Sequence, residues 1–228
     1  MATYNGATFV RQQLESVLCQ LDAEDEVVVS DDGSTDATLE VVRAMGDRRI
    51  RIVEGPKRGL TYNFENAIKN AKGDYIFLCD QDDVWLPNKV ERTVEILQAC
   101  DLVVSDAMIC DADLNDTGRT LFDVHHPRRG AIPTFVHTSY IGCCTAFRRR
   151  VLERLLPFPK NIVMHDYWVG QCCDWFYTTA FIPDVLMKYR RHGGNTSSLS
   201  EGSRLSLFEK ISYRYWIMRG LLLRIFRQ

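Results

Sequence analysis

Short apolar runs that end in polar or acidic residues alternate with segments of helical spacing, and this rhythm limits the folds open to the chain. The runs at 26–30 and 74–79 are typical of strands buried inside a sheet. The alternation predicts an α/β fold with an open, mostly parallel sheet and helices on both faces. Further strands are expected at 49–53, 101–105, 139–147 and 180–189, and helices at 8–21, 36–45, 61–71, 88–99, 165–177 and 204–226.

The composition excludes several classes of protein. Of 228 residues, 46% are hydrophobic and 25% are charged, which fits a folded domain and not a disordered chain. No run of apolar residues is long enough for a membrane-spanning helix, and no secretory signal is visible. The eight cysteines form no C-x-x-C pair, so reduced thiols and a cytoplasmic location are expected.

The near-neutral net charge of −2 hides an uneven distribution along the chain. Residues 1–116 carry a balance of −12, and residues 117–228 carry a balance of +10. The basic half has no stripe of Lys and Arg interleaved with aromatic residues, so nucleic acid is not an expected partner. We interpret the two halves as two sides of one cleft.

Two acidic clusters follow predicted strands, where ligands bind in open α/β sheets. Asp31-Asp32-Gly33-Ser34 follows the run at 26–30, and Asp80-Gln81-Asp82-Asp83 follows the run at 74–79. Clustered carboxylates suit a hard divalent cation such as Mg²⁺ or Mn²⁺. Each cluster alone could be a turn or a helix cap, but two at successive strand ends favour one joint site.

Six motifs follow one another in a fixed order along most of the chain. Each is weak alone, whereas their order and spacing together are specific. They are Ala2-Thr3-Tyr4-Asn5-Gly6, Ser30-Asp31-Asp32-Gly33-Ser34-Thr35-Asp36, Asp80-Gln81-Asp82-Asp83-Val84-Trp85, Gly142-Cys143-Cys144, His165-Asp166-Tyr167-Trp168 and Tyr189-Arg190-Arg191-His192-Gly193-Gly194-Asn195.

These motifs resemble those of the family 2 glycosyltransferases, and within them the rhamnosyltransferase-like enzymes of bacterial surface-polysaccharide assembly. The resemblance implies the GT-A nucleotide-sugar-binding fold over residues 1–197, with a nucleotide-sugar half at about 1–110 and an acceptor half at about 111–197. It also implies transfer of a sugar, with inversion, from dTDP-rhamnose or a UDP-sugar. The acceptor would be a glycan or a lipid-linked molecule, and the cofactor Mn²⁺ or Mg²⁺.

For the donor, the resemblance implies contacts along the first three motifs. Thr3 and Tyr4 would line the base pocket, and Asp32 would hydrogen-bond the base. Asp80 would lie near the ribose, and Asp83 would orient the donor or the metal.

For the chemistry, the resemblance implies roles for four further residues. Asp82 would bind the metal, and His192 would contribute a metal or diphosphate contact. Arg190 could neutralise phosphate charge. Asp166 would be the general base that deprotonates the acceptor hydroxyl. The alternatives are a helix cap for Asp166 and an ordinary loop residue for His192.

The C-terminal segment 204–228 is expected to form a basic amphipathic helix. Its apolar residues recur at spacings of three and four, and its charge balance is +5. Such a helix could pack on its own domain, on a second subunit in a homodimer, or on the inner face of a membrane. The apolar residues are Phe208, Ile211, Tyr215, Met218, Leu222 and Ile225.

Three further expectations concern the less regular parts of the chain. Residues 111–135 have little periodicity and are expected to form a long loop or lid. Family members usually begin with a full apolar strand, of which this sequence has Met1 and Ala2, so a catalytically impaired protein that still binds nucleotide-sugar is the alternative function. A phosphoryl-transfer receiver-like domain ranks last, because its only candidate lysine, Lys188, stands in a different sequence context.

Overall fold

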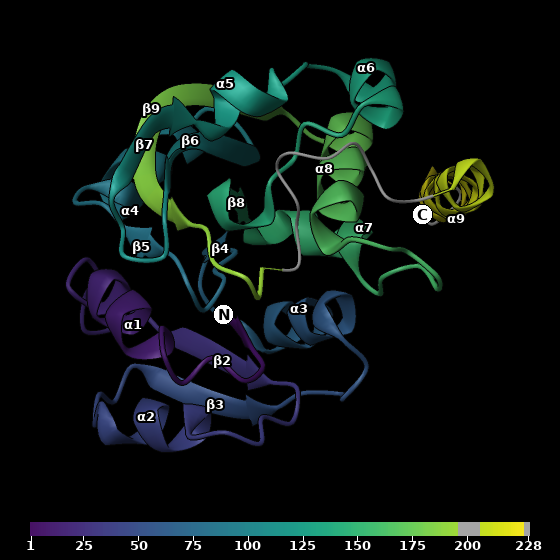
Figure 1. The fold of residues 1–228 in the computed structure, drawn as a ribbon. Helices are drawn as coiled ribbons and strands as arrows, with labels where there is room; N and C mark the ends of the chain where they lie inside the picture. The colour runs from purple at the N-terminus through teal and green to yellow at the C-terminus, as the bar shows by residue number, and fades with distance from the viewer. Residues whose placement is uncertain (196–205, 226–228) are drawn as a thin grey trace.

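Two sheets with helices around them make up the computed structural model, which describes residues 1–195 and 206–225 (Figure 1). The first sheet has the strand order β1-β2-β3, and the second has the order β4-β8-β6-β9-β5, with β7 paired to β6. The strands are β1 (Ala2–Thr3), β2 (Val27–Asp31), β3 (Ile50–Glu54), β4 (Tyr75–Phe77), β5 (Val84–Trp85), β6 (Leu102–Cys110), β7 (Asp116–Thr120), β8 (Thr145–Arg148) and β9 (Thr179–Arg190). The helices are α1 (Val10–Leu18), α2 (Thr38–Ala44), α3 (Leu60–Asn70), α4 (Lys89–Leu97), α5 (Leu121–His125), α6 (Ala131–Val136), α7 (Leu152–Leu155), α8 (His165–Phe176) and α9 (Leu207–Ile225), with 3₁₀ turns at Gly142–Cys144 and Arg149–Val151.

The first sheet is parallel throughout, as the sequence predicts. Strand β2 is buried along its whole length, in keeping with its run of three valines. Strand β1 pairs with β2, and the amide of Ala2 also donates to the carbonyl of Cys79 at 3.3 Å, just after β4. The short β1 therefore connects the two sheets, and its motif lies beside both acidic clusters.

The second sheet differs from the predicted parallel arrangement in its strand directions. Only β6 and β9 run parallel in it, whereas β8 is antiparallel to both β4 and β6. A strand buried on both faces has the same apolar pattern in either direction, so the sequence did not reveal this. The α/β architecture itself, with helices around the sheets, is as predicted. The division into a nucleotide-sugar half and an acceptor half near residue 110 stays a prediction. Strand β6, which ends at Cys110, pairs with β8 on one side and with β9 on the other.

Residues 111–135 are not one long loop, contrary to the prediction. They contain β7, α5 and α6. Asp111 accepts hydrogen bonds from the amides of Asp113 and Asn115, both at 2.9 Å, and so closes the turn between β6 and β7. Thr120 and Asp123 form a reciprocal capping box that starts α5. Hydrogen bonds between single side chains and the nearby backbone order this segment. Such bonds produce no apolar periodicity in the sequence.

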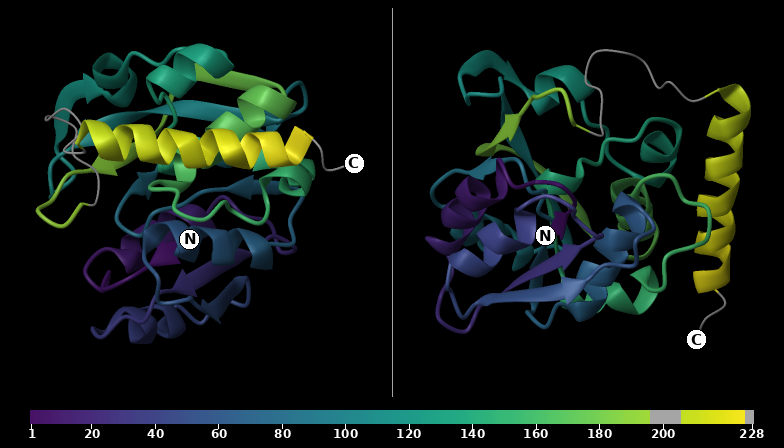
Figure 2. Two further views of the ribbon diagram at one scale, coloured as in Figure 1. Left: turned by 90° about the vertical axis from the view of Figure 1, so that its right-hand side faces the viewer. Right: turned by 60° about the horizontal axis from the view of Figure 1, so that its bottom comes forward.

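Helix α9 lies along one edge of the molecule and packs on α8 (Figure 2). Ile217 and Leu221 are buried there, and Gly220 leaves room for the rings of Trp168 and Pro159. None of the helices in the described ranges combines the length and hydropathy needed to cross a membrane. Of the helix predicted at 204–228, Arg204 and Arg227 lie outside the described residues. All eight cysteines, which lie within residues 1–195, are free thiols as expected.

Candidate active site

A cavity of about 1260 Å³ lies where the six motifs meet. Its size exceeds the ~300–1,000 Å³ usual for one small ligand, so it can hold two ligands side by side. Asp83 and Arg190 are not part of its wall. The predicted residues that line it are Thr3, Tyr4, Asp32, Asp80, Asp82, Asp166 and His192.

The first acidic loop is internally satisfied. Asp31 is buried and accepts hydrogen bonds from the Thr3 hydroxyl at 3.0 Å, from the Ser34 amide at 2.9 Å and from the Ser34 hydroxyl at 2.6 Å. Asp32 accepts from the amides of Lys57 at 2.6 Å and Gly59 at 2.7 Å. Both carboxylates therefore hold backbone in place, and Asp32 fixes the loop that leads into α3. The sequence analysis gave Asp31 no role.

The first and third motifs are joined through Gln81. Its side-chain amide accepts from the Tyr4 amide at 2.9 Å and donates to the Tyr4 carbonyl at 3.0 Å. A Cβ on Gly6 would lie 2.2 Å from Gln81 Oε1, so only glycine permits this approach. With its backbone held, the Tyr4 side chain stays 57% exposed on the cavity wall.

The second acidic loop is not satisfied. Asp83 is 1% exposed; its Oδ1 accepts from the Arg190 amide at 3.0 Å, but its Oδ2 has no hydrogen-bond partner among the described residues. Burial, followed by the charges of Asp82 and Asp80, raises the pKa of Asp83 well above its usual value. Burial, then the charges of Asp82 and Asp166, raises the pKa of Asp80 to about 7. Within this cluster the carboxylates raise one another's pKa values by like-charge repulsion.

Asp82 and His192 are brought together, as predicted. The Asp82 Oδ2 and His192 Nε2 atoms are 2.8 Å apart, and the His192 ring stacks on Phe9 with 4.5 Å between centroids. The Asn195 carboxamide oxygen accepts from the His192 amide at 2.6 Å and so orders the loop after β9.

Arg190 lies behind the acidic loop and does not face the cavity. Its Nε donates to the Asp82 carbonyl, its Nη1 to the Ala112 carbonyl, both at 2.8 Å, and its Nη2 to Gln12 Oε1 at 2.5 Å. The predicted donor contact therefore does not fit its position. Tyr189 lines the cavity, and side chains alternate along a strand, so Arg190 on β9 points the opposite way.

Asp166 lies in the first turn of α8, across the cavity from β1. Burial raises its pKa to about 6, although a hydrogen bond from the Tyr167 amide at 2.7 Å opposes this. A carboxylate near the positive end of a helix with such a pKa can exchange protons near neutral pH.

His165, which the motif contains but the sequence analysis left without a role, is 2% exposed. Its ring stacks on Phe64 with 3.8 Å between centroids, and within the described ranges neither ring nitrogen has a hydrogen-bond partner. Burial lowers its pKa to about 3, so the ring is neutral at physiological pH. A Cβ on Gly142 would lie 2.6 Å from His165 Nε2, which explains the glycine in Gly142-Cys143-Cys144.

A second cluster could contribute to a metal site. Asp80, Asp83 and Cys143 each present a ligand atom, and these three atoms lie within 4.8 Å of one another. The unpartnered Asp83 oxygen and the raised carboxylate pKa values both fit a site that binds a divalent cation. Nothing in the spacing of Cys143 along the chain could have placed it beside the acidic loop.

Comparisons with known proteins agree with the motifs. The sequence model of glycosyl transferase family 2 matches residues 1–156. An uncharacterised glycosyltransferase from Nostoc, alr2836, is 29% identical over 86% of this chain, and this chain spans 64% of that protein. The dTDP-rhamnosyl transferase RfbG of Shigella flexneri is 27% identical over 94% of this chain and 81% of its own length.

Solved structures are similar in fold at low sequence identity. Residues 1–349 of TarS from Staphylococcus aureus, in complex with UDP-GlcNAc, superpose with a TM-score of 0.74 at 17% identity, over 99% of this chain and 65% of that fragment. Glucosyl-3-phosphoglycerate synthase of Mycobacterium tuberculosis, with Mn²⁺ and UDP bound, gives a TM-score of 0.59 at 18% identity, over 98% of this chain and 77% of that chain. At these identities the likeness shows the fold alone.

Proposed function

Because the chain belongs to glycosyl transferase family 2, we propose that it transfers a sugar from a nucleoside-diphosphate donor to an acceptor hydroxyl. One observation carries the proposal: the acidic loop after β4, the His192 loop after β9 and Asp166 on α8 all line one cavity. Residues far apart in the sequence thus supply a donor side and a base around a shared space.

On the donor side, Asp82 and His192 are the proposed ligands of a divalent cation, with Asp80 and Asp83 beside them. When bound, Mn²⁺ or Mg²⁺ would offset the negative charge of the leaving diphosphate as a Lewis acid. Arg190 positions this loop, because it bonds the Asp82 carbonyl and its amide bonds Asp83. The Mn²⁺ in the mycobacterial neighbour supports a metal.

At the other side, Asp166 is the proposed general base. Ionised above a pKa of about 6, it would accept the proton of the acceptor hydroxyl as that oxygen attacks the anomeric carbon. Attack from the face opposite the diphosphate inverts that carbon. His165, neutral and packed on Phe64, holds the start of α8 in place without adding charge beside the base.

We further propose dTDP-rhamnose or a UDP-sugar as the donor, and a growing surface glycan or a lipid-linked molecule as the acceptor. The support comes from the name of RfbG and from the UDP-GlcNAc bound in TarS. The alternative is a protein that binds the donor without turnover.

The test is a panel of UDP, dTDP and GDP, each with and without Mn²⁺, read by thermal shift and followed by a transfer assay with the matching sugar donors. A ligand that binds the folded state raises its apparent stability. We expect one nucleotide to stabilise the protein only with Mn²⁺, and its sugar donor to be consumed. Asp113→Asn serves as a control variant, because it changes an exposed carboxylate outside the cavity wall and should behave as the wild-type protein does.

Two results separate the alternatives. If no nucleotide stabilises a folded sample, the proposed function is wrong. Stabilisation without consumption of any donor or release of nucleotide, in the presence of glycan and lipid-linked acceptors, favours the protein that binds without turnover.

A further inference from the structure

We propose that α9 lies flat on an anionic lipid surface and docks on it by its outward face. The proposal concerns where the protein works and does not depend on which donor or acceptor it uses. It rests on the exposed apolar stripe of α9, on the charges around that stripe and on the contact of the helix with the cavity.

The apolar stripe is defined by Ile211, Tyr215, Met218, Leu222 and Ile225. At 3.6 residues per turn these positions share an arc of about 80°. Ile211 and Tyr215 are each 60% exposed, and Leu222 and Ile225 are also exposed. Phe208 extends the pattern in sequence, but its side chain lies outside what the structure describes.

The helix is attached to its own domain by a different face. Ile217, Gly220 and Leu221 are buried against α8, and the guanidinium of Arg224 lies 4.6 Å from the ring centroid of Trp168. Packing within the protein therefore explains these residues and leaves the apolar stripe unexplained. Contiguous exposed apolar side chains on one helix face are a frequent mark of an interaction surface.

The charges around the stripe favour an anionic surface. Arg219 is exposed on one side of it, and Lys210 lies on the other side, whereas the guanidinium of Arg214 is bound to the carbonyls of Phe135 and Val136. In the described part of α9, Glu209 is the single acidic residue, and it is engaged with Ser206 at 2.7 Å. Cations on both edges of an apolar stripe match a layer of anionic head groups over acyl chains.

The same charges argue against a second copy of the chain. The stripe has the three-four spacing of a coiled-coil seam, in which the flanking residues of two helices meet. Here those flanks would bring basic residues against each other, because Lys210 lies on one flank and Arg219 on the other. A homodimer through this face would therefore be opposed by like charges.

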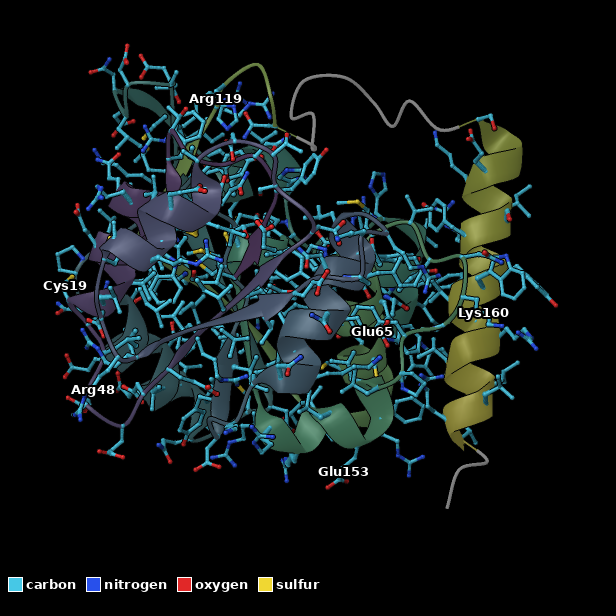
Figure 3. All side chains as sticks on the ribbon, turned by 90° about the horizontal axis from the view of Figure 1, so that it is seen from below. Cys19, Arg48, Glu65, Arg119, Glu153 and Lys160 are labelled. Atoms are coloured by element: carbon cyan, nitrogen blue, oxygen red, sulfur yellow. The ribbon has the colours of Figure 1, made fainter. Side chains whose placement is uncertain are left out.

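The opposite face of the same helix borders the cavity. Tyr213, nearly two turns into α9, lies on that inner face, lines the cavity and meets the ring of Tyr167 edge-on at 5.6 Å. Arg214 donates to the carbonyls of Phe135 at 3.3 Å and Val136 at 2.7 Å, which ties α9 to α6. Figure 3 shows exposed Lys160 beside α9 as well. A protein lying on lipid by this face would hold its cavity beside the surface.

The experiment is sedimentation of the full chain with vesicles of phosphatidylcholine alone, or with about one third phosphatidylglycerol, at ~0.1 M salt. We expect binding to the anionic vesicles, weaker binding at high salt, and little binding to neutral vesicles. The double variant Tyr215→Ser and Leu222→Ser, which changes exposed side chains, should lower the partition coefficient at least about tenfold.

The charge variant and its control use two exposed arginines. Arg219→Glu should weaken binding to anionic vesicles several-fold, whereas Arg48→Glu should not. Arg48 lies at the end of the molecule away from α9 (Figure 3), and both substitutions change the net charge equally. Circular dichroism should show the same melting behaviour for every variant.

Three outcomes overturn the proposal. The first is equal sedimentation with and without anionic lipid. The second is unchanged binding of the double variant. The third is a dimer, shown by light scattering, that the double variant dissociates while wild type binds no vesicles; this outcome assigns the face to a second copy instead.

Discussion

The two acidic loops look alike in sequence and differ in what surrounds their carboxylates. After β2, Asp31 and Asp32 have hydrogen-bond donors on their oxygens and organise the backbone around them. After β4, Asp83 leaves one buried oxygen without a partner in the described chain, and the pKa of Asp80 is raised to about 7 by burial and by neighbouring charge.

The difference distinguishes scaffold from ligand site. A buried carboxylate whose oxygens are satisfied by its own chain stabilises the fold. Carboxylates buried close to one another cost free energy, which a bound cation can offset. The loop after β2 therefore shapes the cavity, and the loop after β4 supplies its charge.

The largest expected effect is at the base. Asp166→Asn should lower kcat by about 10²–10⁴-fold with a small change in the KM for the donor, because general-base catalysis contributes on this scale. In wild type, kcat should rise with pH around an apparent pKa of about 6, since the base must be ionised. A steady-state pH profile checks both. An unchanged kcat in the variant would remove Asp166 from the reaction.

Opposite signs are expected when one carboxylate is removed from each loop. Asp31→Ala should lower the free energy of unfolding by about 3 kcal/mol, because it orphans donors on Thr3, Gly33 and Ser34. Asp83→Asn should raise it by about 1 kcal/mol without metal, because Oδ1 can still accept from the Arg190 amide while the buried charge disappears. Urea unfolding with a chelator present measures both, and equal losses in the two variants would contradict the comparison.

His165 should make the fold sensitive to acid. Its folded-state pKa of about 3 lies below the usual histidine pKa of 6.5, so the unfolded chain binds the proton first and stability falls as pH drops below 6.5. At pH 5 the loss is about 2 kcal/mol. His165→Phe, which keeps the stacking on Phe64, should remove this part of the pH dependence. Unfolding at pH 5 and pH 7 for both proteins gives the test, and parallel slopes would refute it.

The smallest effect is expected where Gln81 joins the acidic loop after β4 to the segment after β1. Gly6→Ala would push the Gln81 amide off the Tyr4 backbone and should cost about 1 kcal/mol in stability. Nucleotide affinity should fall with it, because Tyr4 would no longer be held. Gly46→Ala is the control for affinity: its positive φ should cost stability as well, but no atom lies within 4 Å of its added Cβ and its nucleotide affinity should not change. Full nucleotide affinity in Gly6→Ala would show that Gln81 does not position Tyr4.

Much of the fold could be predicted from the sequence because apolar periodicity is a local signal. Strand β2 and helices α3 and α8 lie close to their predicted ranges. The antiparallel pairing of β8 with β4 could not be predicted from the sequence, because strand pairing is set by long-range topology that a buried apolar run does not encode. The order within 111–135 was missed because the Asp111 turn and the Thr120 capping box rely on single side chains.

The candidate site was predictable as a set of motifs but not as a geometry. Asp82, His192 and Asp166 line the expected cavity because ordered motifs at strand ends specify which side chains meet there. The predicted position of Arg190 at the cavity was not found, because side chains alternate along β9. Tyr189 faces the cavity, so Arg190 faces away from it. Cys143 and His165 became visible only with the neighbours that tertiary packing gives them.

Binding of Mn²⁺ in the presence of UDP or dTDP, followed by electron paramagnetic resonance, tests the central claim most directly. With its cognate nucleotide, the wild-type protein should bind Mn²⁺ and so lower the resonance signal of the free ion, and Asp113→Asn should do the same. Asp82→Asn should bind the ion at least about tenfold more weakly while remaining folded. Equal Mn²⁺ affinity of wild type and Asp82→Asn would contradict the assignment of the loop after β4 as the metal site.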